Sequence, residues 1–461
     1  NKNKNKHFLK TVQMDCWAKL KLSSWAYPTA VLSLYGFFAN CRVAEPFLTP
    51  YLIGPHKNIS AEVTNYLFPI WTYSYLAFLF PVFLLTDFMR HKPVIVTQGL
   101  FLITNYVLLF QTVFHQQINY AVVTSTEVAY FSYIYSIIPS ENYQRATGYL
   151  RSAMLAGYTF GASLGQVLVS IAEMDYFYIN AISLGIVSMA FFISLWLPMP
   201  QRRMFFKGKK DADIKAQSGI THFVPYHSCI LLRQNKINDY SFCFVVCLHL
   251  IYWSLWWALA TAGYNQVFNY IQLMWDHIEP SATSSIYNGG VEAVCSLVGS
   301  AAAFSVGYIK VTWAVWGELA LGLFSAIAAG SVFLMALTSS IWACYVGYVI
   351  FKSCYMFLIT ITTFQIASKL SMECYALMFG INTFVALSLQ AIITVIVVDE
   401  AALGLDILSL QFIIYGSYYS AISLLFLIRG TYTACISHPT ATQPEDKGQK
   451  SSVEVIDAEH F

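Results

Sequence analysis

Some ionisable residues of this 461-residue chain lie within long apolar segments, where a charge has to be paired or hydrated. Glu127 is the clearest example, because no basic residue lies within a helical turn of it in the sequence TSTEVAY, residues 124–130. A carboxylate at the centre of a membrane helix costs about 2.5–3.5 kcal/mol on insertion scales, so it usually faces a cavity or a bundle interior. We therefore predict that Glu127 faces a polar cavity.

Arg42 and Glu45 form a second candidate group, close to the end of an apolar segment. The two side chains could neutralise each other, which would be a structural role. Pro46 and Pro50 interrupt the helix just after them and free backbone carbonyls, as happens near the binding sites of transporters. Both interpretations, structural and functional, remain open for Glu45.

Two further pairs could control conformation. Glu292 has no basic residue near it in sequence, and Lys352, in a later apolar segment, is its predicted partner; the pair would be a gate or a tie between helices. Asp87 and Arg90 lie in the sequence LTDFMRHK, residues 85–92, which resembles the acidic-then-basic loop of the major facilitator superfamily. A gating role is predicted for Asp87 and Arg90, and the alternative is a solvated turn.

Aromatic and hydrogen-bonding side chains alternate at helical spacing in WTYSY (residues 71–75) and in YNQ (residues 264–266), and Tyr158 belongs to the same group. Such a mixture suits a flat, polar ligand, including a cationic one, held by stacking and cation–π attraction. Ordinary packing is the alternative for any single ring.

The composition places these residues in a membrane. Hydrophobic residues make up 57% of the chain and charged residues 11%, whereas soluble domains carry about 25% charged residues. The short basic clusters flank apolar segments, which indicates membrane anchoring rather than nucleic-acid binding. No disulfide framework, metal site, cofactor or paired catalytic carboxylates are expected, so an enzyme is not predicted.

We predict an all-α polytopic protein with about twelve transmembrane helices in two six-helix halves of the major facilitator type. The expected domains are a cytoplasmic segment (1–24), the first half (25–197), a charged cytoplasmic linker (198–240), the second half (241–429) and a disordered cytoplasmic tail (430–461). Within this plan the third and fourth spans (93–114 and 120–138) are joined by residues 115–117. About twelve spans do not fit a seven-helix receptor.

The distribution of Lys and Arg predicts the orientation. With both termini in the cytoplasm, nearly all basic residues fall on the cytoplasmic side, and the outer loops receive Lys57 alone. Asn58 begins the glycosylation sequon Asn-Ile-Ser, which then lies in the first outer loop. We expect a multi-pass glycoprotein of the plasma membrane.

Several stretches together resemble the solute-carrier family of reduced-folate and thiamine transporters. They are EPFLTPYL (45–52), FPIWTYSY (68–75), WSLWW (253–257), IYNGGVEA (286–293), FQIA (364–367) and FGINTF (379–384). The chain looks most similar to the thiamine transporters. The resemblance implies a major-facilitator fold that carries thiamine into the cell by alternating access.

The resemblance also implies the sign of the substrate's charge. Folate carriers place an arginine where Glu127 stands and a lysine where Gln390 stands, so the cavity becomes suited to a cation and hostile to a dicarboxylate. Lys352 matches a basic position of the folate carriers and argues the other way. A folate, a thiamine phosphate ester, pyridoxine or a cationic drug are the alternative substrates.

The binding residues carried over from the family are Trp71 and Tyr120, which match the rings on either side of thiamine, and Glu45, Tyr158 and Asn265, which match its polar contacts. At one position the chain departs from the family: thiamine carriers have a glutamate against the aminopyrimidine where this chain has Gln117. An amide can still hydrogen-bond there but cannot form an ion pair. Reduced affinity, a shifted ligand or a fault in the sequence at this position would each account for it.

Overall fold

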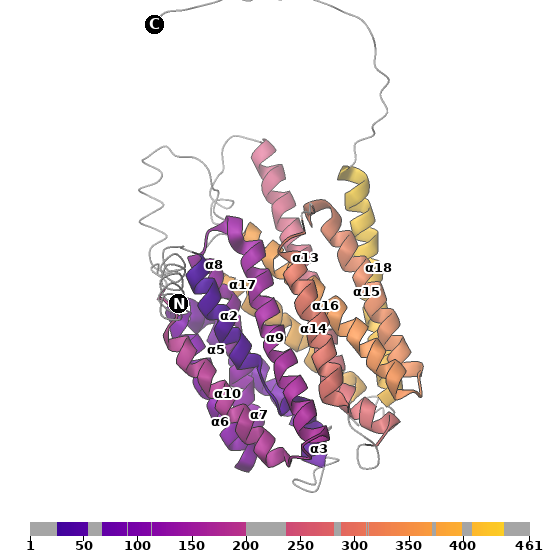
Figure 1. The fold of residues 1–461 in the computed structure, drawn as a ribbon. Helices are drawn as coiled ribbons and strands as arrows, with labels where there is room; N and C mark the ends of the chain where they lie inside the picture. The colour runs from indigo at the N-terminus through magenta and orange to yellow at the C-terminus, as the bar shows by residue number, and fades with distance from the viewer. Residues whose placement is uncertain are drawn as a thin grey trace, which may run out of the picture.

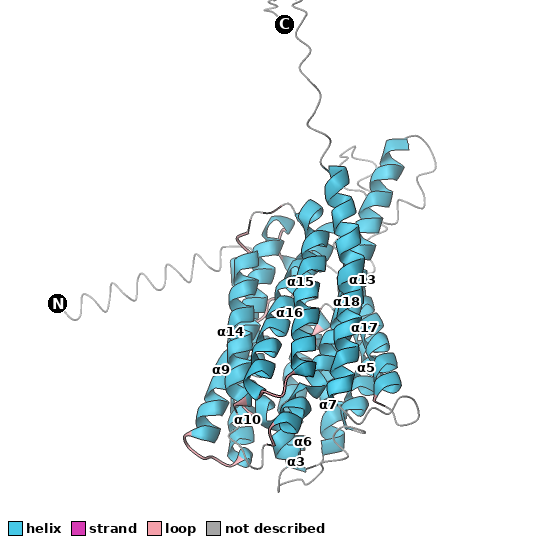
Figure 2. Ribbon diagram, turned by 90° about the vertical axis from the view of Figure 1, so that its right-hand side faces the viewer, coloured by secondary structure: helices cyan, strands magenta, loops and turns pink. Residues whose placement is uncertain are grey.

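The computed structural model describes most of the apolar part of the chain. The described residues are 25–53, 67–89, 91–111, 113–199, 237–280, 287–309, 311, 313–370, 375–398 and 408–437. Asn58, Arg90 and the segments 1–24, 201–236 and 438–461 lie outside them, as does the side chain of Asp87. Within the described ranges the regular structure is entirely helical, as the all-α prediction requires (Figure 2).

The first half of the chain forms one group of helices. They are α2 (Ala26–Asn40), the 3-10 turn η1 (Glu45–Phe47), α3 (Leu48–Ile53), α5 (Phe68–Met89), α6 (Lys92–Gln111), α7 (Val113–Thr126), α8 (Val128–Ile137), η3 (Ser140–Asn142), α9 (Tyr143–Ser170) and α10 (Tyr176–Leu195). The second group comprises α13 (Ile237–Ile278), α14 (Asn288–Val306), α15 (Trp313–Leu337), α16 (Ile341–Lys369), α17 (Tyr375–Val397) and α18 (Leu408–Ser437).

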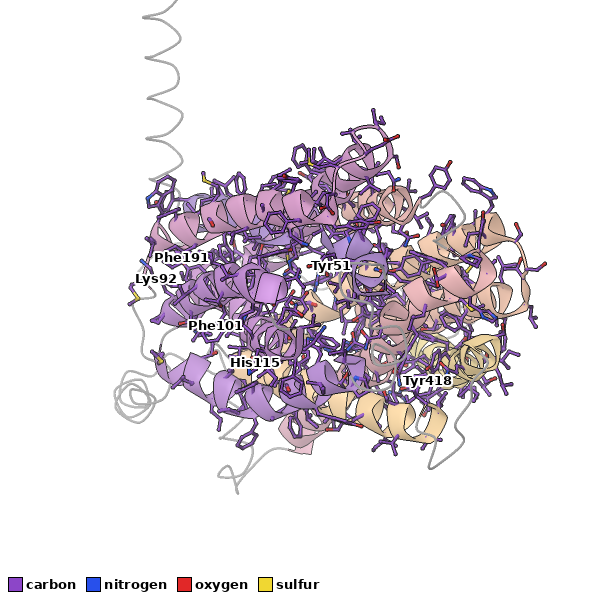
Figure 3. All side chains as sticks on the ribbon, turned by 90° about the horizontal axis from the view of Figure 1, so that it is seen from below. Tyr51, Lys92, Phe101, His115, Phe191 and Tyr418 are labelled. Atoms are coloured by element: carbon purple, nitrogen blue, oxygen red, sulfur yellow. The ribbon has the colours of Figure 1, made fainter. Side chains whose placement is uncertain are left out.

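The two groups stand side by side with their helices roughly parallel (Figure 1). Across the junction, α5 packs against α17 and α9 packs against α14. Seen along the helices, the two groups meet near Tyr51, whereas Lys92 and Phe191 lie at the edge of the first group (Figure 3). Nine helices in the described part of the chain are long and apolar enough to cross a membrane.

A row of glycines on α9 brings the first helix close. Gly157, Gly161 and Gly165 are four residues apart and therefore share one helix face. A Cβ atom at Gly157 would lie 2.1 Å from the carbonyl oxygen of Phe37, and one at Gly161 would lie 2.8 Å from the backbone nitrogen of Arg42. Small residues permit such close backbone approach between membrane helices. This contact fixes the segment that carries Arg42 and Glu45 against α9.

Three predicted boundaries differ from the structure. Residues 115–117 belong to α7 rather than to a loop, because α6 ends at Gln111 and α7 begins at Val113. The polar residues Gln116 and Gln117 are tolerated within this helix because they line a pocket. The boundary predicted at 240 falls inside α13, and the boundary predicted at 429 falls inside α18.

Candidate substrate-binding site

A pocket lies between the two groups of helices, with free space of about 890 Å³ including its open mouth. Its walls come from η1, α3, α5, α6 and α7 of the first group and from α13 of the second. Its polar and aromatic lining includes Arg42, Glu45, Trp71, Gln116, Gln117, Tyr120 and Gln272.

Three side chains form a connected polar group in the pocket wall. Arg42 Nη1 donates to Glu45 Oε2 at 3.3 Å and also to the hydroxyl oxygen of Tyr120. The Tyr120 hydroxyl lies 3.5 Å from Glu45 Oε1, and Arg42 Nε donates to the carbonyl oxygen of Ala39 at 2.9 Å. The ion pair neutralises both charges and holds them at the pocket. The structural and functional interpretations of Glu45 are therefore compatible.

The predicted aromatic pair is present at the same place. The ring centroids of Trp71 and Tyr120 are 6.4 Å apart, with planes tilted by 31°, and Trp71 also lies 5.6 Å from Tyr75. These separations are those of aromatic rings in contact with one another. A flat ligand that binds between Trp71 and Tyr120 has to move the two rings apart.

Three buried polar atoms without a hydrogen-bond partner in the described part of the chain belong to this wall. Trp71 Nε1, Gln116 Oε1 and Gln272 Oε1 are buried and have no hydrogen-bond partner among the described residues. Buried polar groups are almost always paired in folded proteins. One donor and two acceptors at the pocket are thus available to a polar ligand or to water. The side-chain nitrogen of Gln116, Nε2, donates to Asn105 Oδ1 at 3.1 Å.

Glu127 lies at a break between helices rather than in the middle of one. α7 ends at Thr126 and α8 begins at Val128. Arg151 of α9 and Arg42 are the basic groups whose charges act on Glu127. The guanidinium carbon of Arg151 lies 4.3 Å from the centroid of the Phe131 ring, and its Nε is buried without a partner in the described part of the chain. The proximity of Arg151 to Glu127 was not predicted from the sequence, because the two residues are distant from each other along the chain.

Glu292 and Lys352 form an ion pair, as their sequence context predicted. Lys352 Nζ donates to Glu292 Oε2, and the Tyr348 hydroxyl donates to Glu292 Oε1 at 2.9 Å. The side chains are only 3% and 1% exposed. Lys352 Nζ also lies 4.9 Å from the ring centroid of Tyr158 on α9. The pair therefore joins α14 to α16 and contacts the other group of helices.

Asn265 belongs to a chain of amide and hydroxyl groups. Its Nδ2 donates to Gln390 Oε1 at 3.0 Å, and Gln390 Nε2 donates to Thr72 Oγ1 at 3.2 Å. Asn265 lies on the same face of α13 as Phe268 and Gln272, which line the pocket. Thr72 directly follows Trp71 in α5. Asn265 is thus placed just beyond the pocket wall, at the junction of α5, α13 and α17.

The predicted residues therefore fall into two sets. Glu45, Trp71, Tyr120 and Gln117 line the pocket, whereas Glu127, Tyr158 and Asn265 lie outside its lining. The sequence analysis did not single out Asn105, Gln116 or Gln272. Amide side chains within otherwise apolar spans were the available signal, because such groups usually face a bundle interior.

The helices are closed against each other at the opposite end of α9. The Tyr143 and Tyr375 hydroxyls are 2.9 Å apart, and Gln144 Nε2 donates to the carbonyl oxygen of Val306 at 2.6 Å. The Tyr149 and Tyr308 hydroxyls form another bond, of 2.7 Å. The pocket wall, by contrast, is near Gly161 and Gly165 at the other end of α9. A pocket between two groups of helices, which are closed against each other at the opposite end, is the arrangement expected of a membrane transporter.

The comparisons with known proteins identify the family. A sequence model described as "Reduced folate carrier" matches residues 23–414. The chain is 50% identical to human thiamine transporter 2, over 94% of this chain and 95% of the relative. It is 44% identical to human thiamine transporter 1 over the same shares, and 37% identical to the human reduced folate transporter, over 94% of this chain and 77% of the relative. The chain belongs to the reduced folate carrier family.

A solved structure supports the fold independently. The human organic anion transporter MFSD10 superposes with a TM-score of 0.56 and covers 88% of this chain, while 98% of its own length is matched. At 13% identity this likeness concerns the fold alone. The chain is a multi-pass membrane protein with a transporter fold. The family and the relatives are transporters rather than enzymes.

Proposed function

We propose that the protein carries thiamine across the plasma membrane into the cell by alternating access. The observation that carries the proposal is the pocket in which the Arg42–Glu45–Tyr120 group meets Trp71, in a chain that is 50% identical to human thiamine transporter 2. Thiamine combines two flat rings, an amino group and a fixed positive charge. The pocket offers aromatic faces, hydrogen-bond acceptors and a nearby carboxylate.

The distribution of charge supports a cation over a folate. Lys352 is the basic residue that would favour a dicarboxylate, but its charge is compensated by Glu292. Arg42 is likewise compensated by Glu45. An anion would have to compete with both internal carboxylates. A reduced folate remains the second candidate because the family includes its carriers, and competition between the two vitamins separates them.

The proposed orientation places the pocket mouth outside the cell. The described residues just before the predicted linker lie at the end at which Tyr143 contacts Tyr375, because the Tyr133 hydroxyl donates to the carbonyl oxygen of Pro198 at 2.7 Å and the Tyr143 hydroxyl donates to that of Tyr135 at 3.0 Å. With that end in the cytoplasm, the structure represents a state that is closed inwards. We propose that Glu292 and Lys352 stabilise it as a tie between helices. An epitope inserted at 201–236 should be accessible only after permeabilisation; labelling of intact cells would contradict this orientation.

Uptake of radiolabelled thiamine, in cells that lack endogenous carriers, tests the function. The wild type should take up thiamine, and an excess of reduced folate should compete weakly. Glu127→Gln should reduce thiamine uptake strongly at normal surface expression, because it removes the carboxylate at the break between α7 and α8. A matched control is Glu141→Gln, an exposed acidic residue of η3, which should leave uptake unchanged. Undiminished uptake by Glu127→Gln would contradict the role of this carboxylate.

A further inference from the structure

The ammonium group of Lys352 lies among three aromatic rings. Its Nζ is 4.9 Å from the ring centroid of Tyr158, 5.6 Å from that of Tyr348 and 5.7 Å from that of Phe268. A cation within about 6 Å of a ring centroid is attracted by the quadrupole of the ring. The rings come from α9, α16 and α13, so both groups of helices contribute to this environment.

A carboxylate completes the surroundings of the ammonium. Glu292 Oε2 accepts a hydrogen bond from Lys352 Nζ, and Glu292 Oε1 accepts one from the Tyr348 hydroxyl at 2.9 Å. The Lys352 side chain is only 3% exposed. Aromatic cages are a means by which proteins recognise ammonium ligands. Tyr158, Phe268, Tyr348 and Glu292 are together called the cation cage.

The cation cage adjoins the pocket. Phe268 lines the pocket and is also one of the three rings around Lys352. Tyr158 is partly buried, and the charges of both Glu45, in the pocket, and Glu292, in the cage, act on it. The ring of Phe268 therefore belongs to the pocket wall and to the cage at the same time.

We propose that the cation cage is a binding site for a primary ammonium ion, which the chain fills with its own Lys352, so that a cation in the adjacent pocket cannot pair with Glu292. Lys352→Ala removes Cγ, Cδ, Cε and the ammonium, which together have the size of n-propylammonium. The vacated cage should take that ion from solution. The inference does not depend on which vitamin the protein carries.

Thermal unfolding of purified Lys352→Ala in a non-ionic detergent tests the proposal. The variant should melt below the wild type, because Glu292 loses its ammonium partner. Addition of n-propylammonium chloride should raise the melting temperature, since a ligand that binds only the folded state stabilises it. Above half-saturation each tenfold rise in concentration corresponds to about 1.4 kcal/mol, so the melting temperature should keep rising with the logarithm of the concentration.

Matched solutes and variants separate a specific site from general effects. Sodium chloride at equal ionic strength and propan-1-ol at equal concentration should leave Lys352→Ala unchanged, because neither supplies an ammonium. The wild type should not respond to n-propylammonium, since Lys352 already fills the cage. Lys92→Ala, which truncates an exposed lysine bonded to the Leu195 carbonyl oxygen, should not respond either.

Two additions to Lys352→Ala identify the groups that hold the ion. With Glu292→Gln the response to n-propylammonium should be lost, because the carboxylate is gone. With Phe268→Leu the same rise in melting temperature should need a severalfold higher concentration, because one of the three rings is missing.

The proposal is overturned if n-propylammonium raises the melting temperature of Lys352→Ala no more than sodium chloride does. An equal rise with propan-1-ol would show that filling a void is sufficient, and an equal rise in the wild type would show that Lys352 does not block the site. If Lys352→Ala is not recovered in folded form, the fraction of monodisperse protein is compared after extraction with and without n-propylammonium. No gain in that fraction also contradicts the proposal. None of these outcomes bears on thiamine uptake by the wild type, which tests the proposed function separately.

Discussion

Removal of one partner from the Glu292–Lys352 pair should destabilise the protein severely. The two side chains are 1% and 3% exposed. In Lys352→Met the Glu292 carboxylate keeps only the Tyr348 hydroxyl as a partner among the described residues, with a donor–acceptor distance of 2.9 Å. Breaking a buried ion pair on one side typically costs about 3–5 kcal/mol, because an uncompensated charge stays buried. Glu292→Gln should cost a similar amount, since Lys352 would then face only aromatic rings and an amide.

The double variant should be more stable than either single variant. Once both charges are absent, the cost of burying a lone ion disappears, and replacing a buried pair by neutral groups is often close to neutral. We expect the sum of the two single losses to exceed the loss in the double variant by at least about 3 kcal/mol, which is the coupling energy between the two residues. The control is Lys92→Met, whose ammonium donates to the carbonyl oxygen of Leu195 at an exposed site. It should change stability by less than about 1 kcal/mol.

Unfolding of the purified protein by SDS titration measures these differences, and thiamine uptake measures their effect on function. If Lys352→Met unfolds at the wild-type detergent concentration, the pair contributes nothing and the tie is misassigned. If the double variant is as unstable as the sum of the single variants, Glu292 and Lys352 act independently. If the double variant is stable but transports poorly, the pair serves the conformational cycle in addition to the fold.

Further substitutions test the pocket and the helix packing. Trp71→Ala should weaken the apparent affinity for thiamine about tenfold in concentration-dependent uptake, since a desolvated cation–π contact is worth about 1–2 kcal/mol. Trp71→Phe should weaken the affinity less. An unchanged affinity in Trp71→Ala would place the site elsewhere. Gln117→Glu should tighten binding if the pocket is hydrated, because it restores a carboxylate towards the amino group, and loss of transport at normal surface expression would rank another substrate above thiamine. Gly157→Val should prevent accumulation at the cell surface, because its Cβ would lie 2.1 Å from the Phe37 carbonyl oxygen, while Gly185→Ala, with open space around it, should be tolerated in the same assay.

Residue types in the sequence were sufficient to predict the class of fold. An apolar composition, long spans and a charged linker indicate an all-helical membrane protein, and the described helices confirm this. The pairing of Glu292 with Lys352 was also predictable, because two opposite charges buried far apart in sequence stabilise the protein only if they meet. The boundary between α6 and α7 was not predictable in this way. Gln116 and Gln117 suggested a loop because they are polar, although a helix can carry amide side chains where they line a pocket.

Spatial neighbours from different helices explain the other gaps. Arg151 lies on α9 and Glu127 between α7 and α8, so their proximity depends on how those helices pack. The glycine row on α9 sets a different contact, the close approach of α2 and residues 41–43. The row positions Arg42 through a backbone contact, and the sequence of α2 contains no pattern that would predict this contact. The bond between Asn265 and Gln390 likewise joins α13 to α17.

Buried charges in and around the pocket affect which ligands it can accept. Two ion pairs have no net charge: Arg42 with Glu45, and Lys352 with Glu292. Glu127 and Arg151 interact without an ion pair among the described residues, and Arg151 Nε has no partner there. These two groups can therefore respond to a ligand without the cost of breaking a buried pair. A cation near Glu127 gains an attraction that Arg151 only partly offsets, whereas a dianion is repelled by that carboxylate. We therefore expect Glu127, which forms no salt bridge among the described residues, to favour a cation over a dianion.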